Sequence, residues 1–166
     1  MDGVRASIAQ LWSDALRFVY GERLPKLPVG GKMLRPALSL LSAGALGEER
    51  TPRFVPLATA MELLHLAALA HDDVIDHADL RHGMRSLNAM WDNHTAVLGG
   101  DYLVARAIHI LGSYDSCLVI TNAINSVREM SEGELTYFGL GREHYSPEAC
   151  ISLARQKTAS LFAVAC

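Results

Sequence analysis

Apolar side chains recur at steps of three and four residues along most of the chain. Ile8, Leu11, Trp12, Leu16 and Val19 set this spacing at the start, and it is the spacing of amphipathic helices. Two prolines and two glycines in LPKLPVGG then end the pattern. The sequence therefore opens with a helix followed by a loop.

The same pattern predicts five further helices. The second has Arg35-Pro36 in its first turn and Gly47 as its stop, and the long third helix runs from Pro52 or Pro56 to a glycine cap at 81–83. The others are expected over 93–111, over 114–138, and from Pro147 to the end, with Ser146 as N-cap. Because no segment alternates as a strand does, the predicted fold class is all-α.

Composition limits the size and setting of this fold. With 166 residues, half of them hydrophobic, the chain suits one core, so residues 1–166 are expected to form a single helical domain. Its net charge of −3 argues against a nucleic-acid or anionic-membrane partner. Three widely separated cysteines favour a reducing compartment, the cytoplasm, and no uncharged apolar run is long enough to predict a membrane span.

The third predicted helix carries carboxylates in an apolar setting, in the stretch HLAALAHDDVIDHADLRHG. At about 100° per residue, five polar side chains share one stripe of that helix. They are Glu62, His65, Asp72, Asp73 and Asp76. Like charges on one helix face repel, so a cation must compensate, and Mg²⁺ held by Asp72, Asp73 and Asp76 together with a substrate phosphate would do so. The alternative is a solvated acidic face paired with neighbouring cations.

Basic residues form a second cluster of candidates. Lys32 and Arg35 in GGKMLRP begin the second predicted helix, where backbone N–H groups also favour an anion. Further along the chain, the pairs Arg81-His82 and Lys157-Thr158 offer additional donors. Acidic stripe and basic cluster together indicate a site for two phosphate groups, one bridged by metal and one held by cations.

Several motifs, in this order, resemble the trans-prenyl diphosphate synthases, or polyprenyl synthetases. They are GGKMLRP, E-x-x-H with HDDVID, DLRHG, WDNHTAVLGGDYLVARA, EGEL and KTASLF, spanning about 30–162. The resemblance implies a helical bundle around a central cavity, usually a homodimer. It also implies head-to-tail condensation of isopentenyl diphosphate with an allylic prenyl diphosphate, with Mg²⁺ as cofactor.

The resemblance also implies roles for individual residues. It assigns the Mg²⁺ ions that grip the allylic diphosphate to the three aspartates of the stripe, and the isopentenyl diphosphate to Lys32, Arg35 and His65. Arg81 matches the arginine that contacts the allylic diphosphate, and Lys157 and Thr158 match the pair that steadies it during ionisation. The expected catalytic set is thus Asp72, Asp73, Asp76, Arg81, Lys157 and Thr158.

The sequence departs from the family pattern at three points. His82 stands where a second arginine for the homoallylic diphosphate is usual, and Tyr137 stands where glutamine is common. No acidic residues after Asp79 have the spacing of a second aspartate-rich motif. The sequence therefore matches the N-terminal half of the family's fold, and we expect either a piece of a longer enzyme or a short subunit that needs a complementing synthase subunit.

Three functions stay open on the sequence. The first is a prenyltransferase, although the 166-residue chain alone is expected to be inactive. The second is a non-catalytic or partner-dependent subunit of a prenyl diphosphate synthase. The third is a His-Asp type metal phosphohydrolase, suggested by His71-Asp72, but His71 and His77 lie off the stripe.

Small residues before the aspartates bear on product length. Ala67 and Ala68 lie one helical turn before Asp72, where a prenyl tail would pass. Alanine leaves the cavity open, and in the family aromatic residues at these positions accompany short products. We therefore expect a product of twenty carbons or more, with depth limited by Leu64 or Met61; the alternative is that the alanines only let a neighbouring helix approach.

Overall fold

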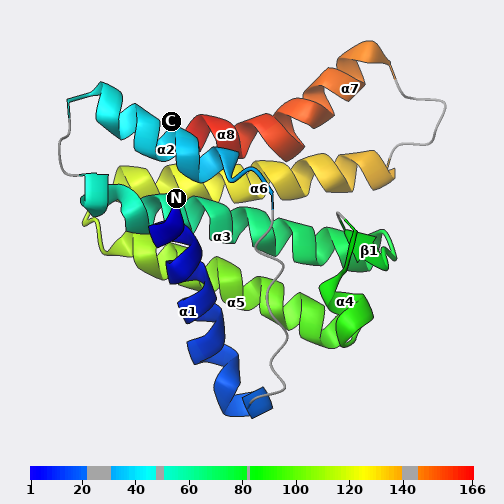
Figure 1. Cartoon of the computed structure of the whole chain (residues 1–166). Helices are drawn as coiled ribbons and strands as arrows, with labels where there is room; N and C mark the ends of the chain where they lie inside the picture. Colours follow the sequence, from blue (N-terminus) through cyan, green and yellow to red (C-terminus); the bar gives the residue numbers. More distant parts are fainter. Residues whose placement is uncertain (22–30, 48–50, 82, 140–145) are drawn as a thin grey trace.

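The computed structural model describes residues 1–21, 31–47, 51–81, 83–139 and 146–166. The predicted all-α fold is confirmed, since these residues form helices joined by short turns, with one hairpin of two-residue strands (Figure 1). The helices are α1 (Asp2–Tyr20), α2 (Leu34–Ala45), α3 (Thr51–Ile75), α4 (Leu87–Met90), α5 (Asn93–Gly112), α6 (Cys117–Gly139), α7 (Pro147–Ala154) and α8 (Ser160–Ala165). A π-helical turn, Arg155–Ala159, joins α7 to α8.

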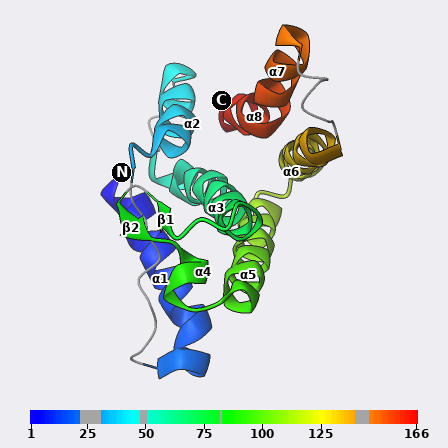
Figure 2. The same cartoon turned by 90° about the vertical axis from the view of Figure 1, so that its right-hand side faces the viewer.

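Helix α3 is the centre of the bundle. It packs most extensively on α5 and also contacts α1, α2 and α8, so that Figure 2 shows it surrounded by other helices. Its side chains from Ala58 to Leu64 are almost all fully buried. A helix that is apolar on most faces belongs in an interior. This position accounts for the stretch Pro52–Ile75, which is the only one among the described residues that is long and apolar enough to cross a membrane.

Helix α3 ends earlier than the sequence predicted, at Ile75 and not near Arg81–Gly83. His77 takes the left-handed conformation that was expected of Gly83, with φ 51°. The N–H of Ala78 donates to the carbonyl of Asp73 at 2.9 Å, and that of His77 donates to Val74 at 3.3 Å, which is the Schellman end of a helix.

The residues after this end form the hairpin that the sequence did not predict. Strands β1 (Leu80–Arg81) and β2 (Met84–Arg85) pair antiparallel, and Gly83, with φ 78°, lies in the turn between them. Asn88, in α4 directly after the hairpin, ties α4 to the end of α3, because its side-chain amide donates to the carbonyls of Asp73 and Ala78. The early end of α3 therefore turns Arg81 back toward the helix.

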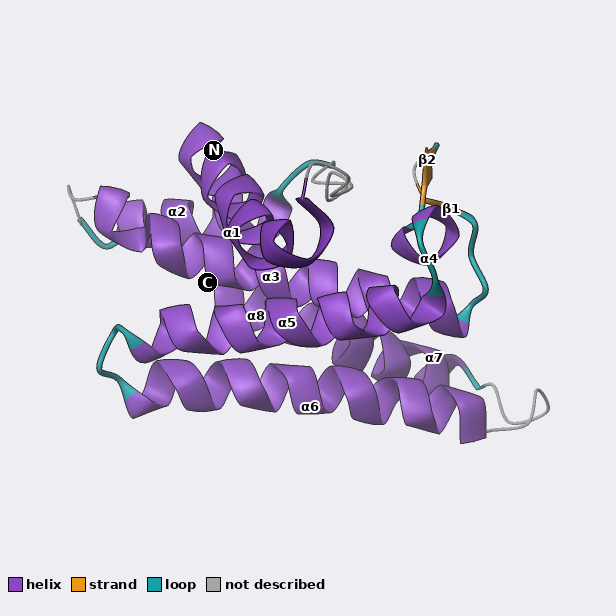
Figure 3. Cartoon of the chain, turned by 90° about the horizontal axis from the view of Figure 1, so that it is seen from below, coloured by secondary structure: helices purple, strands orange, loops and turns teal. Residues whose placement is uncertain are grey.

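The remaining helix boundaries agree closely with the predicted ones. Ser146 caps α7 by accepting from the N–H of Ala149, with Pro147 in the first turn, and Asp92 caps α5 through the N–H of Thr95. Helices α5 and α6 run antiparallel across one side of the bundle (Figure 3). The last helix was expected to be continuous, but the π-helical turn adds a residue between α7 and α8.

The π-helical turn packs directly on α6 at Gly133. A Cβ atom on this glycine would lie 2.9 Å from the Cβ of Gln156, closer than real Cβ atoms approach. Neither atom can rotate away, so we expect Gly133→Ala to lower the free energy of unfolding by about 1–3 kcal/mol.

Gly112→Ala is the matched control, because a Cβ there meets nothing within 4 Å. We expect it to leave stability unchanged or raise it by up to about 1 kcal/mol, since alanine restricts the unfolded chain. Urea unfolding of the three proteins provides the measurement. Equal stability of the Gly133→Ala variant and the unsubstituted protein would contradict the close packing.

Candidate functional site

The polar stripe of α3 is divided between two cavities. The first, here called the basic pocket, has a volume of about 490 Å³ and lies beside the start of α2 and the hairpin. Its polar lining comprises Lys32, Arg35, Glu62, His65, Asp73 and Arg81. The second, here called the aspartate pocket, has a volume of about 670 Å³ and lies between α3, α6 and the π-helical turn. Its lining includes Asp72, Ala68, Glu134, Lys157 and Thr158.

Three residues belong to both cavities. Arg35, His65 and Leu69 line the basic pocket and the aspartate pocket alike. The two cavities are therefore neighbours, with α3 carrying Asp73 into one and Asp72 into the other.

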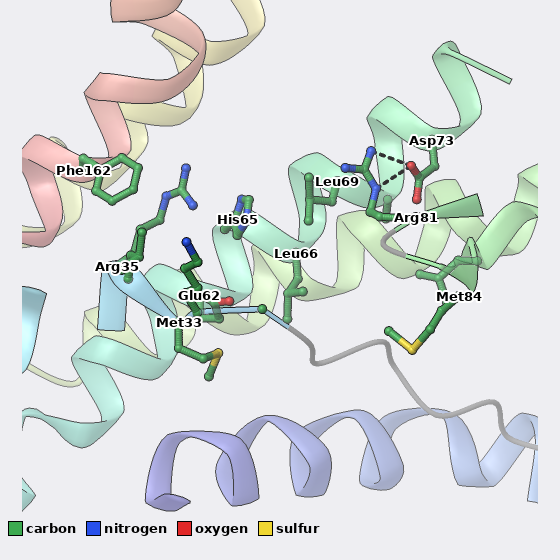
Figure 4. A pocket seen from close by; sticks show the side chains of 15 residues that line it. Met33, Arg35, Glu62, His65, Leu66, Leu69, Asp73, Arg81, Met84 and Phe162 are labelled. Atoms are coloured by element: carbon green, nitrogen blue, oxygen red, sulfur yellow. Dashed lines mark hydrogen bonds and ion pairs between the residues drawn. The ribbon is translucent and has the colours of Figure 1, made fainter. Parts of the chain in front are cut away.

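Arg35 is the most enclosed cation of the basic pocket. Its guanidinium carbon lies 4.3 Å from the ring centroid of Phe162, which reaches across from α8 (Figure 4). Burial lowers the pKa of Arg35, and the charge of Glu62 opposes this shift. In turn, burial raises the pKa of Glu62, opposed by the charges of Arg35 and Arg5. The pocket thus holds a buried carboxylate among several cations.

Asp73 and Arg81 form a close ion pair in the basic pocket. Oδ1 of Asp73 accepts from Nε of Arg81 at 2.7 Å and lies 2.5 Å from Nη2, so both nitrogens converge on one carboxylate oxygen (Figure 4). The Asp73 side chain is only 5% exposed. The structure thus places Arg81, expected at the allylic diphosphate, in the pocket of Lys32, Arg35 and His65.

Lys157 connects two carboxylates in the aspartate pocket. Its Nζ lies 2.5 Å from Oε2 of Glu134 and 3.3 Å from Oδ2 of Asp72. Burial lowers the pKa of Lys157, but the hydrogen bond to Glu134 and the charge of Asp72 outweigh it, so that the net shift is upward. The pKa of Asp72 is raised, first by burial and then by the neighbouring charges of Glu134 and Asp76, against the opposing effect of Lys157.

The described carboxylates fit a metal ion only in part. Among the residues the structure describes, no three histidine, cysteine, aspartate or glutamate side chains are arranged to hold a metal ion. Asp72 and the exposed Asp76, directly after α3, are near enough for their charges to interact. Two carboxylates suit Mg²⁺ when phosphate oxygens and water complete its shell. Asp73 faces the other cavity and is paired with Arg81.

The two alanines expected to set product length lie in different surroundings. Ala68 lines the aspartate pocket and also a further cavity of about 400 Å³ between α3, α5 and α6. Leu64 lines that further cavity, as expected of a residue that limits depth. Ala67 is 1% exposed in the hydrophobic core and, like Met61, lines neither cavity.

Three further residues named in the sequence analysis are Thr158, His82 and His71. Thr158 lies in the aspartate pocket beside Lys157, as expected, whereas His82 lies outside the described residues. His71, which the helical spacing placed off the stripe, has its Nε2 3.1 Å from the carbonyl of Val97 and 3.3 Å from the carboxylate of Asp101. The imidazole is thus engaged with α5.

Sequence reasoning missed the contributions of two residues. Glu134 of the EGEL motif was not among the predicted site residues, and its pairing with Lys157 shapes the aspartate pocket. Phe162, at the end of the KTASLF motif, was likewise not predicted as a site residue, and its ring covers Arg35. The available signal for Glu134 was a carboxylate within a family motif.

Solved structures share this arrangement of helices. A decaprenyl diphosphate synthase from Rhodobacter capsulatus superposes with a TM-score of 0.86 at 33% identity, over 99% of this chain and 51% of that protein. A polyprenyl synthase from Caulobacter crescentus, solved with calcium and isoprenyl diphosphate, gives 0.82 at 31% identity, over 99% and 51%. The fold is that of the all-α isoprenoid synthases.

Sequence comparison identifies the family within this class. The polyprenyl synthetase profile matches residues 22–166. An all-trans-nonaprenyl-diphosphate synthase of Rhodobacter capsulatus is 38% identical over 82% of this chain and 42% of that protein. Component 2 of a heptaprenyl diphosphate synthase from Geobacillus stearothermophilus is 36% identical over 97% and 52%. The chain belongs to the polyprenyl synthetase family and spans about half the length of these relatives.

The Asp73–Arg81 pair generates a prediction about stability. Asp73→Asn leaves the Arg81 guanidinium, 27% exposed, without its buried counter-charge, so we expect a loss of about 2 kcal/mol in the free energy of unfolding. Asp76→Asn, at an exposed site three residues on, is expected to change it by less than about 0.5 kcal/mol. Denaturant unfolding compares the two variants, and a small effect at Asp73 would show that the pair adds little.

Proposed function

We propose that this chain forms the first half of a trans-prenyl diphosphate synthase, which condenses isopentenyl diphosphate with an allylic prenyl diphosphate. The observation that carries the proposal is the pair of adjacent cavities, each with cations facing an aspartate of α3. Two diphosphates, bound side by side, require two cationic pockets at a short distance. Family membership supports the same assignment.

The basic pocket is assigned to isopentenyl diphosphate and the aspartate pocket to the allylic substrate. Lys32, Arg35 and His65 surround the first, with Arg81 beside them and His82 assigned to the same substrate. Lys157 and Thr158 face Asp72 in the second. Mg²⁺ on Asp72 and Asp76 would neutralise the departing pyrophosphate, and Asp73 could join them as a further ligand only by leaving its pair with Arg81 in the basic pocket.

The reaction that suits this arrangement begins with ionisation. Cations that face the leaving pyrophosphate stabilise it as its bond to the allylic carbon breaks, and Lys157 is positioned for this task. Apolar side chains also line the aspartate pocket, among them the half-buried Leu69 and Met130, and in a completed site they would help to keep water from the carbocation. The double bond of isopentenyl diphosphate then attacks the cation, and the new cation that this forms loses a proton to a base such as the released pyrophosphate, so no protein nucleophile is needed.

A second polypeptide segment is needed to complete this site. The described half supplies one aspartate-rich motif, and the chain covers about half of its relatives. Either a homodimer of a longer chain or a complementing synthase subunit in the cytoplasm could supply the rest. The similarity to a relative named component 2 of a heptaprenyl diphosphate synthase favours the complementing subunit.

Binding to the isolated chain tests the proposed function. We expect farnesyl diphosphate to bind weakly and only with Mg²⁺, with little or no turnover, and Asp72→Asn to weaken binding about tenfold or more. The control is Glu132→Gln, which also removes one carboxylate charge. Glu132 is paired on the surface with Arg128, so this change should not alter binding. Calorimetry that found equal affinities for all three proteins would reject the assignment of the aspartate pocket.

Product length provides a separate prediction. In the completed synthase, a prenyl tail of twenty carbons or more would pass Ala68 into the further cavity beyond it. Ala68→Phe is therefore expected to shorten the product, whereas Ala67→Phe should mainly destabilise the core by about 1–3 kcal/mol. Product chromatography and thermal unfolding distinguish the two outcomes. A product of unchanged length from the Ala68→Phe enzyme would place the floor elsewhere.

A further inference from the structure

Phe162 is the side chain of the basic pocket whose chemistry the proposed function does not use. It lies on α8, near the end of the described chain, and faces α2 across the pocket entrance (Figure 4). Its ring covers the guanidinium of Arg35, a residue 127 positions earlier, with 4.3 Å between the guanidinium carbon and the ring centroid. An aromatic ring cannot bind a diphosphate directly, so its position needs another explanation.

Burying the charge of Arg35 costs free energy, and neighbouring groups must offset this cost. Burial lowers the pKa of its guanidinium, which shows that the surroundings disfavour the charge. The buried carboxylate of Glu62 opposes this effect. A second carboxylate in direct contact would stabilise the charge further, but it would also occupy N–H donors and repel a phosphate.

A cation–π contact avoids that conflict. The ring face attracts the guanidinium through its charge and takes none of its N–H groups, which lie at the edge of the guanidinium plane. Consistent with this, the Nε atom of Arg35 is buried and has no hydrogen-bond partner among the described residues. The ring thus holds Arg35 without using its N–H groups, and the hydrogen-bonding capacity of Nε is unmet among the described residues.

We propose that Phe162 is a positioning residue for diphosphate binding, since its ring holds the Arg35 guanidinium over α2 with its N–H groups directed to an isopentenyl diphosphate. This inference rests on the proposed function, because the ligand is assigned to the basic pocket by it. Phe162 acts through Arg35 and does not itself contact the phosphate.

Binding of isopentenyl diphosphate to variants of the chain tests the proposal. Phe162→Leu keeps an apolar side chain but removes the ring face, and we expect it to weaken binding about threefold to tenfold. Phe162→Tyr keeps the ring face and should stay within about twofold of the unsubstituted protein. The matched control is Phe54→Leu, the same change at a half-buried site on α3 outside the basic pocket, with no expected effect on binding.

The comparison between variants decides the outcome. A loss in Phe162→Leu that Phe162→Tyr rescues supports positioning by the ring face. Equal losses in Phe162→Leu, Phe162→Tyr and Phe54→Leu would overturn it, because they would reflect general destabilisation. Unchanged binding in Phe162→Leu would overturn it as well.

A double-mutant cycle separates this inference from the proposed function. If the unsubstituted chain binds no isopentenyl diphosphate, the proposed function fails, but the Arg35–Phe162 contact can still be measured by urea unfolding. Phe162→Leu should reduce the folding equilibrium constant in both backgrounds. The factor of reduction should be several-fold larger when Arg35 is present than in an Arg35→Met background. Additive effects of the two substitutions would show that the ring does not hold Arg35.

Discussion

The ion pairs made by the second half of α3 are the constraint on which the site depends. Carboxylates on a buried helix are stable only if cations from other elements reach them, because isolated charges are costly in an apolar interior. Arg81 reaches Asp73 from the hairpin, and Lys157 reaches Asp72 from the π-helical turn. Each pair therefore fixes the position of an element that the helix pattern alone would leave free.

This pairing also relates stability to ligand binding. The cations that neutralise Asp72 and Asp73 here are the same ones assigned to diphosphate groups, so binding would exchange one set of charge partners for another. Such an exchange costs less than creating new buried charges, since both partners are already desolvated. Without ligand, Asp72 and Asp73 correspond to the alternative of an acidic face paired with neighbouring cations, and metal binding by these residues stays a prediction.

Helical periodicity predicted the fold well because apolar spacing and, for α5 and α7, a capping side chain are local properties of the sequence. Ser146 and Pro147 are examples, since their preference for a helix start is a local property. The end of α3 could not be predicted in the same way. His77 takes the left-handed conformation because the chain must turn there for Arg81 to reach Asp73, and that requirement comes from tertiary contacts.

The sequence predicted the aspartates of the site but not their division between two cavities. Asp72 and Asp73 are adjacent, and an angular plot placed them on one stripe, yet about 100° of rotation between them is enough to direct them into separate cavities. Glu134 and Phe162 make their contacts across more than twenty and more than one hundred residues respectively. Pairings of this kind depend on how helices cross, which one sequence does not specify.

The π-helical turn has a consequence for how the end of the chain is aligned. Its wide hydrogen bond, from the N–H of Ser160 to the carbonyl of Arg155, accommodates one more residue than an α-helical turn. Deleting a residue there would restore a regular helix but rotate everything after it by about 100°. Lys157 could then no longer face Asp72 while Phe162 faces Arg35. The extra residue of the π-helical turn therefore sets the rotation that lets both contacts form.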